Sequence, residues 1–441
     1  NTTECEPLDG WGFRRGAYQC RCRPHTHLPF YIRRPYLGEI IERSTEEEYK
    51  SNFDCSKTNW LHKIPVQRDV LSETYREQML LTYEEYRNVS ESDFKPLHTK
   101  RTNIHHVLNF IRSMDWVKCL DYSAEDLVLP GEFAYNADKQ FVNEARMAVR
   151  LANFISAFLQ INDPKALYSE KRLVDKPLTE DQMIAETVAL VIGNSKIQSA
   201  GMYWDRNKFV NRTFFAPFAY KQQRIDRKFF VEDLARLWNT SEVYTKKSWF
   251  RDLKHRWSVT NDNLEKFTVE MHIRHSELGE FLQKFENYPL TYYAAKLEHG
   301  IWSEPFYDCK GRFPQWILTY AVPFFGYDSI KARREFKGVV AVNMNLLDLD
   351  INQCSDEEYV PNKFRNTHKC DQKSSTCVPL MGRGYDVGGY KCECLQGFEY
   401  PLEDPITYVD GQLLESEFWN VVNRNASRFD MLKCRLQTDR Y

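Results

Sequence analysis

The sequence of 441 residues contains no apolar run near the ~20 residues that a transmembrane helix needs. It also begins without a signal peptide, and its first residues, Asn1-Thr2-Thr3, resemble the interior of a longer protein. An excess of one charge is lacking too, because 60 lysines and arginines nearly balance 62 aspartates and glutamates, giving a net charge of −2. This balance gives no reason to expect a nucleic-acid partner.

Motifs of enzymatic chemistry are missing as well, since the sequence has no P-loop, nucleophile elbow, dinucleotide-binding fingerprint or His-Glu-x-x-His. His272 and His275 have the spacing of metal ligands, but no third ligand can be identified. We interpret them, like His105 and His106, as ordinary surface or core histidines. We therefore expect neither an enzyme nor a bound metal or cofactor.

Cysteine, in contrast, is present in an even number and at uneven positions, with ten of the twelve residues near the two ends of the chain. Five Asn-x-Ser/Thr sites accompany the cysteines. Together these features indicate disulfides and glycans in an oxidising, extracellular compartment. The cysteines are Cys5, Cys20, Cys22, Cys55, Cys119, Cys309, Cys354, Cys370, Cys377, Cys392, Cys394 and Cys434, and the glycosylation sites are Asn1, Asn88, Asn211, Asn239 and Asn425.

The cysteines reveal an internal repeat. Residues 5–22 have the pattern Cys-x14-Cys-x-Cys, and residues 377–394 repeat it with glycines and aromatic residues in the same register. A further cysteine follows each copy, at Cys55 and Cys434. The chain therefore contains two copies of one small disulfide module.

The region between the modules has the pattern of an α+β domain. Helical periodicity covers residues 104–117 and 137–159, and a third helix begins at Thr179 with a capping box. Strand-like runs follow at 197–204 and 213–220. Finally, 316–326 and 338–346 predict two strands that form a central antiparallel pair.

This last hairpin resembles the closing hairpin of an extracellular Cache (PAS-like) sensor domain, although other α+β domains also contain central hairpins. The resemblance implies long N-terminal helices followed by a mixed or antiparallel sheet. The predicted organisation is a partial cysteine-rich module over 1–60, a linker over 61–97, a Cache domain over 98–349 and a cysteine-rich stalk over 350–441.

With Cys354 and Cys370 added, the second module resembles the epidermal-growth-factor-like module, and the sequence alone permits several disulfide pairings. For the first copy, which we interpret as the end of an upstream repeat, the resemblance implies Cys22–Cys55. It leaves Cys5 and Cys20 to pair with each other or with a segment outside residues 1–441. For the second copy it implies Cys354–Cys377, Cys370–Cys392 and Cys394–Cys434.

The start of the second module offers a calcium alternative. Asp350, Asn352 and Gln353 resemble the opening of calcium-binding modules of this kind, but calcium prefers more oxygen ligands than these residues supply. We therefore expect a polar strand end that leads into a stalk.

A closer resemblance rests on residues 249–257 and 303–309, the hairpin, and the cysteine-rich segment from Asp350. Together these segments resemble the ectodomain of the metabotropic glycine receptor family, which are orphan class C G-protein-coupled receptors, in an invertebrate-type form. The resemblance implies a plasma-membrane receptor with this chain on the extracellular face, a seven-helix domain outside this chain, and a disulfide between Cys119 and Cys309.

The family's amino-acid pocket uses an Arg-Ser step, an aromatic-x-acid step and an aspartate, which align with Ile192-Gly193, Phe306 with Asp308, and Asn343. Only Asp308 retains its charge, so the resemblance implies the pocket but not glycine as its ligand. We expect a small amine or a secreted peptide or protein. Candidate walls of the pocket are Tyr203, Trp204 and Tyr307.

Two further alternatives remain open. A basic cluster interleaved with aromatic residues is usually the solvated face of a helix, but it would also suit a sulfated glycan. The whole chain would also suit an adhesion or matrix-binding protein that uses its modules as protein-contact surfaces. With either function the chain could form a homodimer. The basic residues are Lys246, Lys247, Arg251, Lys254 and Arg256.

Overall fold

The structure is a computed structural model, and it divides into two compact units that are described separately. Unit 1 comprises Asn1–Asn109 with Asp350–Tyr441, and unit 2 is Phe110–Leu349. The predicted linker over 61–97 lies outside the described residues. The structure describes residues 2–8, 14–23, 26–27, 36–57, 104–160, 178–210, 212–221, 228–236, 243–259, 264–267, 272–274, 281–284, 292–309, 314–328, 333–355, 359, 361–400, 408–423 and 425–437.

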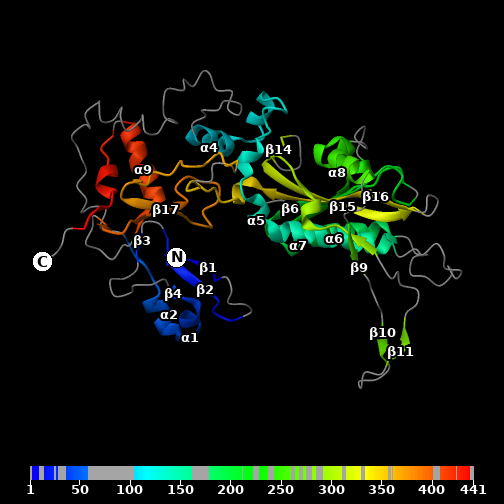
Figure 1. Cartoon of the computed structure of the whole chain (residues 1–441), viewed down its shortest axis with the longest axis horizontal. Coiled ribbons are helices and arrows are strands. Elements are labelled where there is room, and N and C mark those ends of the chain that lie inside the picture. Colours follow the sequence, from blue (N-terminus) through cyan, green and yellow to red (C-terminus); the bar gives the residue numbers. More distant parts are fainter. Residues whose placement is uncertain are drawn as a thin grey trace. The chain divides into compact units, whose positions relative to one another are not determined.

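Unit 2 is built on a seven-stranded antiparallel sheet (Figure 1). Its order is β13-β15-β16-β6-β7-β8, and β14 also pairs with β15. The long central pair confirms the predicted hairpin; β15 continues two residues past its predicted end, and β16 begins five residues before its predicted start. The strands are β6 Ile197–Trp204, β7 Pro217–Lys221, β8 Phe229–Asp233, β13 Ile301–Trp302, β14 Phe306–Tyr307, β15 Trp316–Asp328 and β16 Arg333–Asn345.

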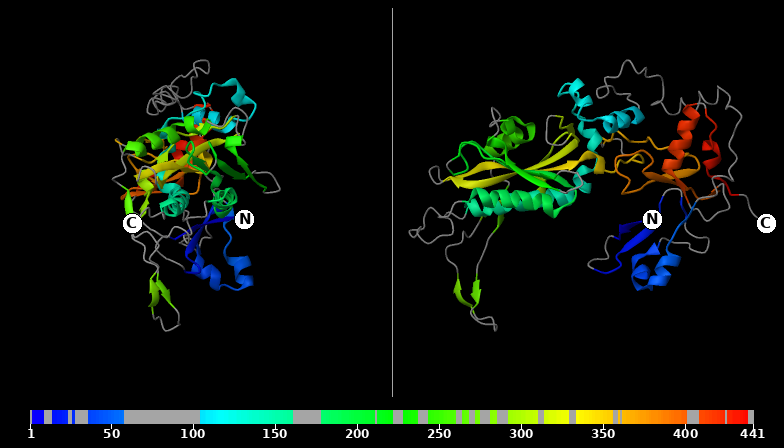
Figure 2. Two further views of the ribbon diagram at one scale, coloured as in Figure 1. Left: turned by 90° about the vertical axis from the view of Figure 1, so that its right-hand side faces the viewer. Right: turned by 180° about the vertical axis from the view of Figure 1, so that it is seen from behind.

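Helices cover both faces of this sheet (Figures 1 and 2). Helices α6 (Val142–Gln160) and α7 (Glu180–Gly193) pack on one face, and α8 (Ser248–Val259) packs over β15 and β16 on the other. The predicted capping box of α7 is present, between Thr179 and Gln182. Helix α8 faces the sheet with its large apolar side chains, because these recur at helical spacing: Trp249, Phe250, Leu253 and Trp257 are all buried.

The other elements of this part of the chain are short. Helix α4 (Ile104–Ser113) crosses the boundary between the units, and among the helices that the structure describes none is long and apolar enough to cross a membrane. The short elements are η4 Lys118–Asp121, η5 Gly131–Ala134, α5 Ala137–Gln140, η8 Leu234–Arg236, η9 Val243–Lys246, β9 Glu265–Phe267, β10 His272–Arg274, β11 Phe281–Lys284, β12 Tyr292–Ala294, η10 Leu297–His299 and η11 Leu346–Asp348.

Unit 1 contains the two cysteine-rich modules, which share one arrangement of a β-hairpin, a third short strand and a helix. The first has β1 Thr3–Pro7, β2 Tyr18–Cys22, β3 Thr26–His27, β4 Tyr36–Leu37, α1 Gly38–Arg43, α2 Glu46–Asn52 and β5 Ser56–Lys57. The second has β17 Ser375–Pro379, β18 Tyr390–Cys394, β19 Phe398–Glu399, β20 Val409–Asp410, α9 Gly411–Val422, η12 Phe429–Leu432 and β21 Arg435–Leu436.

All twelve cysteines form disulfides, in the pairs that the resemblances implied, and Cys5 is joined to Cys20. The second module also has its own core, in which Tyr390 and Phe418 are fully buried between the hairpin and α9. The cysteine spacing does not predict α9, so the epidermal-growth-factor-like description covers the cysteine pattern and not the helix. The remaining pairs are Cys22–Cys55, Cys119–Cys309, Cys354–Cys377, Cys370–Cys392 and Cys394–Cys434.

Candidate functional site

The α8 side of the sheet carries a row of polar side chains across its three central strands. The sheet register places Thr319, Asn343 and Ser199 next to one another on β15, β16 and β6. The Thr319 hydroxyl donates to Asn343 Oδ1 (2.6 Å), and Asn343 Nδ2 donates to the Ser199 hydroxyl oxygen (2.8 Å). Asn343 stays partly exposed although its neighbours along β16 are buried, so solvent reaches the middle of the sheet here.

The adjacent row on the same face contains only small residues. Ala321, Ala341 and Gly201 pair across the same three strands. The ring of Tyr203 lies over Gly201, where a Cβ atom would come within 2.7 Å of it. Tyr203 in turn packs against Trp249 of α8, with ring centroids 5.1 Å apart. The site therefore has a polar floor and an aromatic wall.

An acidic group stands at the β14 end of this face. Phe306 pairs with Ile317 of β15, and the next residue but one is Asp308, whose backbone N–H donates to the carbonyl of Gln315 (3.1 Å). Burial raises the pKa of the Asp308 carboxyl, and attraction to the Lys247 ammonium opposes that rise. Among the described residues, no hydrogen bond or ion pair involves the Asp308 carboxylate.

Two polar groups that sequence reasoning did not select as ligand-binding lie near Asp308. The ammonium of Lys247, which directly precedes α8, is 5.3 Å from the centroid of the Phe306 ring. The side-chain amide nitrogen of Gln315 is buried, and no described residue accepts a hydrogen bond from it. A ligand in this site would therefore meet one carboxylate and one ammonium.

Several residues predicted for the pocket lie elsewhere. Trp204 packs with Phe209 and Phe324 on the α6 and α7 face, because adjacent residues of a strand point to opposite faces. Tyr307 likewise points away from Phe306, and its hydroxyl donates to the carbonyl of Pro314 (2.7 Å). Burial raises the pKa of Tyr307 to about 12, which fits a packed core residue.

The aligned Ile192-Gly193 pair is also distant from this face. Both residues end α7, where Ile192 is 58% exposed and Gly193 faces Met147 of α6. The position next to Asn343 belongs instead to Ser199, which sequence reasoning missed. Strand alternation was a usable signal, because it places Ser199 on the same face as Tyr203.

The other predicted sites fall into three groups. The basic residues just before and within α8 are exposed, although Lys254 contacts Asp205 (2.8 Å), and the glycan contact stays a prediction: Lys246, Lys247, Arg251, Lys254 and Arg256. Asn425 is exposed. The sequons Asn1, Asn88, Asn211 and Asn239, together with His275 and the side chains of His105, His106 and His272, lie outside the described residues.

The oxygens proposed for calcium make bonds within the module. The Asp350 carboxylate accepts from the N–H groups of Gly382 (2.8 Å) and Gly384 (2.6 Å). Gln353 Oε1 accepts from the Gly388 N–H (2.7 Å), and Asn352 Oδ1 accepts from that of Cys354 (2.9 Å). These contacts support the alternative interpretation of a strand end fixed to the stalk.

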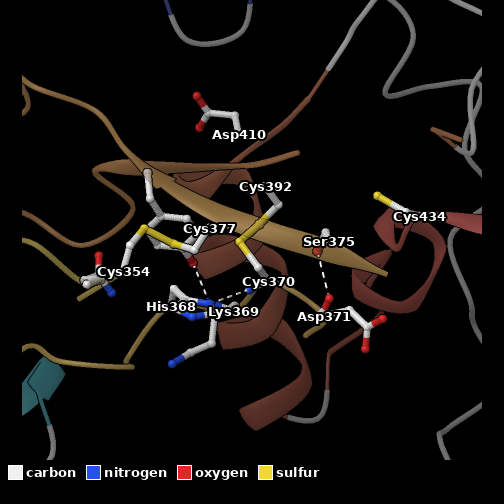
Figure 3. The surroundings of a disulfide bond; sticks show 12 residues. Cys354, His368, Lys369, Cys370, Asp371, Ser375, Cys377, Cys392, Asp410 and Cys434 are labelled. Carbon is white, nitrogen blue, oxygen red and sulfur yellow. Dashed lines mark hydrogen bonds between the residues drawn. A yellow bond between two sulfur atoms is a disulfide. The ribbon is translucent and has the colours of Figure 1, made fainter. Parts of the chain in front are cut away.

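Another cluster in this module has the ligand types of a metal site. His368, Cys370 and Cys377 approach one another, as Figure 3 shows around the disulfide. Both sulfurs are bonded, to Cys392 and Cys354 respectively, so neither is a thiolate that binds metal. The Nδ1 atom of His368 accepts from the Cys370 N–H (3.2 Å) instead.

Comparison with known proteins identifies relatives of part of the chain. Residues 301–399 match the family model of the GPR158/179 extracellular domain. The chain is 39% identical to the metabotropic glycine receptor of Rattus norvegicus over 105 residues, which cover 23% of this chain and 8% of that receptor. It is 34% identical to G-protein coupled receptor 179 of Mus musculus over 127 residues, which cover 27% and 5%. The chain thus spans only a small part of these relatives, which are receptors and not enzymes.

Solved structures were compared as well. The extracellular domain of the putative histidine kinase soHK1S-Z6 aligns with a TM-score of 0.29 and 14% identity, covering 68% of this chain and 97% of that domain. The periplasmic sensory domain of the Campylobacter jejuni chemoreceptor Tlp1 aligns with a TM-score of 0.26 and 10% identity, covering 63% and 90%.

Proposed function

We propose that this chain is the ligand-sensing region of an orphan class C G-protein-coupled receptor, since residues 301–399 match the family model of the GPR158/179 extracellular domain. The receptor would lie in the plasma membrane with this chain outside the cell. The matched residues include Asp308 and Asn343, so they cover the acidic end and part of the polar floor of the site. They include neither Ser199 nor Lys247.

We further propose that unit 2 is a Cache sensor. Its support is the order of elements, in which long helices precede an antiparallel sheet whose other face carries the site. On that face two neighbouring rows across the three central strands contain only polar and small residues, whereas the rest of the face packs against α8.

The observation that carries a ligand-binding function is the state of Asp308. Its carboxylate is partly buried and has no hydrogen-bond partner among the described residues, and the attraction to Lys247 offsets only part of the cost of burying its charge. An ammonium group would remove this penalty, and the adjacent Phe306 ring adds a favourable surface for a cation. A small amine, or a basic side chain of a secreted peptide or protein, is therefore the proposed ligand.

Free glycine fits the same site less well. Its carboxylate needs a cation or several donors, and no arginine lies in the row formed by Ser199, Asn343 and Thr319. Ile192-Gly193, aligned with the family's Arg-Ser step, ends a helix on the opposite face. We therefore expect weak glycine binding, lower by about two to four decades than a site with both charged contacts would give.

A ligand at this site would signal through β16. This strand carries Asn343 and continues through η11 into Asp350, whose carboxylate is bound by Gly382 and Gly384 of the stalk module. In sequence, β16 and η11 thus lead directly into a residue that is bonded within the stalk module. This is the proposed route toward the membrane domain.

The test is calorimetry on the purified chain with amines, amino acids and basic peptides. Asp308→Asn should abolish binding of the ammonium ligand, because it removes the charge and keeps the shape. Asp252→Asn is the matched control, since Asp252 is an exposed residue of α8. Saturable micromolar glycine binding that Asp308→Asn abolishes would contradict the proposed ligand class.

A protein-contact function is the second candidate, and one surface favours it. Trp116, Val117 and Leu120 are 66%, 52% and 63% exposed around the buried, disulfide-bonded Cys119. Such a group of exposed apolar side chains on a braced segment is typical of protein interfaces. Substitution of Trp116 by serine should abolish partner capture by the ectodomain if this function is the main one, and leave amine binding unchanged.

A further inference from the structure

Lys247 is held at a fixed place beside the site. It links η9 to α8, where its backbone N–H donates to the Tyr244 carbonyl (3.2 Å) and its carbonyl accepts from the Arg251 N–H (3.0 Å). Tyr244 is itself anchored, because its hydroxyl donates to the Trp204 carbonyl (2.6 Å). The backbone of Lys247 is therefore fixed, and its long side chain decides where the ammonium lies.

That ammonium occupies the place that suits a ligand's cation. It lies 5.3 Å from the centroid of Phe306 and within electrostatic reach of Asp308. The side chain is nevertheless exposed, so it can move into solvent without breaking a packed core. Neighbouring Lys246 is also exposed, and it makes no such contact among the described residues.

We propose that Lys247 is a tethered cation that fills the position in which a ligand's ammonium would lie, so that a ligand must displace it to bind. This inference rests on the proposed function, because it concerns the same site. Lys247 would then set the affinity of the site, because a ligand binds only if its cation interacts with Asp308 and Phe306 more favourably than the Lys247 ammonium does. Under the opposite arrangement, in which Lys247 binds a ligand's carboxylate, removal of the ammonium would weaken binding.

The contacts favour displacement over cooperation. An ammonium stacked on Phe306 and attracted by Asp308 already has its partners, and turning it toward a ligand carboxylate would remove both. A ligand ammonium at Asp308 would in turn be repelled by the lysine until the side chain leaves. Removing a cation–π contact of this kind should tighten ammonium binding about two- to fivefold.

The binding test uses ethanolamine and putrescine as probes and measures dissociation constants by NMR titration of the whole chain. Lys247→Gln should bind both probes about two- to fivefold more tightly than the unchanged protein. Lys246→Gln is the matched control and should bind as the unchanged protein does. Weaker or equal binding by Lys247→Gln would overturn the inference.

A second measurement needs no ligand. Reductive methylation with carbon-13 keeps the lysine charge and gives each lysine an NMR signal, and the Lys247 signal is the one that Lys247→Gln removes. We expect this signal to show an aromatic ring-current shift that Phe306→Leu abolishes, with circular dichroism confirming that the variant is folded. A Lys247 signal without that shift contradicts the inference. A shifted signal in a protein that binds neither probe would support the contact between Lys247 and Phe306, but it would contradict the proposed function and with it the displacement of Lys247 by a ligand.

Discussion

Removing the Cys119–Cys309 disulfide should strongly destabilise unit 2. Cys119 lies in η4, and Cys309 directly follows Asp308, so the bond ties the segment after α4 to the acidic end of the site. Cys119 is buried, and alanine is the better replacement because serine would bury an unpaired hydroxyl. The variant is Cys119→Ala with Cys309→Ala.

The expected magnitude follows from the length of the closed loop. The bond spans 190 residues, and loop-closure entropy of the unfolded chain gives about 5 kcal/mol for a loop of that length. The Cys22–Cys55 disulfide spans 33 residues in the other unit and should contribute about 4 kcal/mol there. Its alanine variant is the control, because it removes a disulfide without touching unit 2.

The assay is urea unfolding followed by tryptophan fluorescence, since among the described residues of unit 2 five tryptophans are buried or partly buried: Trp204, Trp249, Trp257, Trp302 and Trp316. The Cys119–Cys309 variant should shift their transition to lower urea, while the Cys22–Cys55 variant should leave it in place. Equal tryptophan midpoints for the unchanged protein and the Cys119–Cys309 variant would refute the reasoning.

Three smaller perturbations follow from single contacts. Asn343→Leu removes the partner of both Thr319 and Ser199 and should lower the free energy of unfolding by about 2–4 kcal/mol in urea titrations. Burial raises the pKa of Asp308 in the folded protein, so above pH ~4 the unfolded state binds fewer protons than the folded state. The stability of the unchanged protein relative to Asp308→Asn should therefore fall as pH rises through the folded-state pKa. Thermal melts at successive pH values measure this difference. Gly388→Ala should destabilise more than Gly382→Ala in thermal melts, because both have positive φ but only the Gly388 Cβ would meet backbone, 2.6 Å from Gln412 N.

The fold of unit 2 was largely predictable because its strongest patterns are local. Period-two alternation of apolar residues marked β15 and β16, and Thr179 with Gln182 marked the start of α7. Helix α8 was anticipated only as one solvated face, since its basic residues dominate the composition. The buried Trp249 and Trp257 show that the same helix covers the sheet.

The site was predicted less well, for a reason that strand geometry makes clear. Tyr203 with Trp204, and Phe306 with Tyr307, were each placed in one pocket, but neighbours on a strand point to opposite faces. Lys247 could not be assigned from sequence, because its contact with Phe306 joins segments 59 residues apart that only the fold brings together. Asp308 was identified because it is the aligned pocket position that retains the charge of the family's residue.

The two cysteine-rich modules share more structure than their cysteine spacing indicates. Gly16 and Gly388 both have φ of +83°, and a Cβ atom at either would meet the backbone at the start of the following helix. These helices begin at Gly38 and Gly411. A Cβ atom at Gly38 would lie 2.7 Å from the carbonyl oxygen of Gly16, and one at Gly411 would lie 2.8 Å from that of Gly388. Close backbone packing of this kind excludes any side chain at either position.

The same correspondence includes a pair of side chains. The Tyr18 hydroxyl donates to Glu42 (3.2 Å) in the first module, and the Tyr390 hydroxyl donates to Glu415 (3.0 Å) in the second. Both glutamates lie four residues after the glycine that opens the helix, but the register between the copies shifts by one residue after the Cys-x-Cys. An alignment of the two copies without a gap therefore does not match the residues of one helix to those of the other. The helix belongs to the module itself, since the tyrosine of the hairpin bonds to it in both copies.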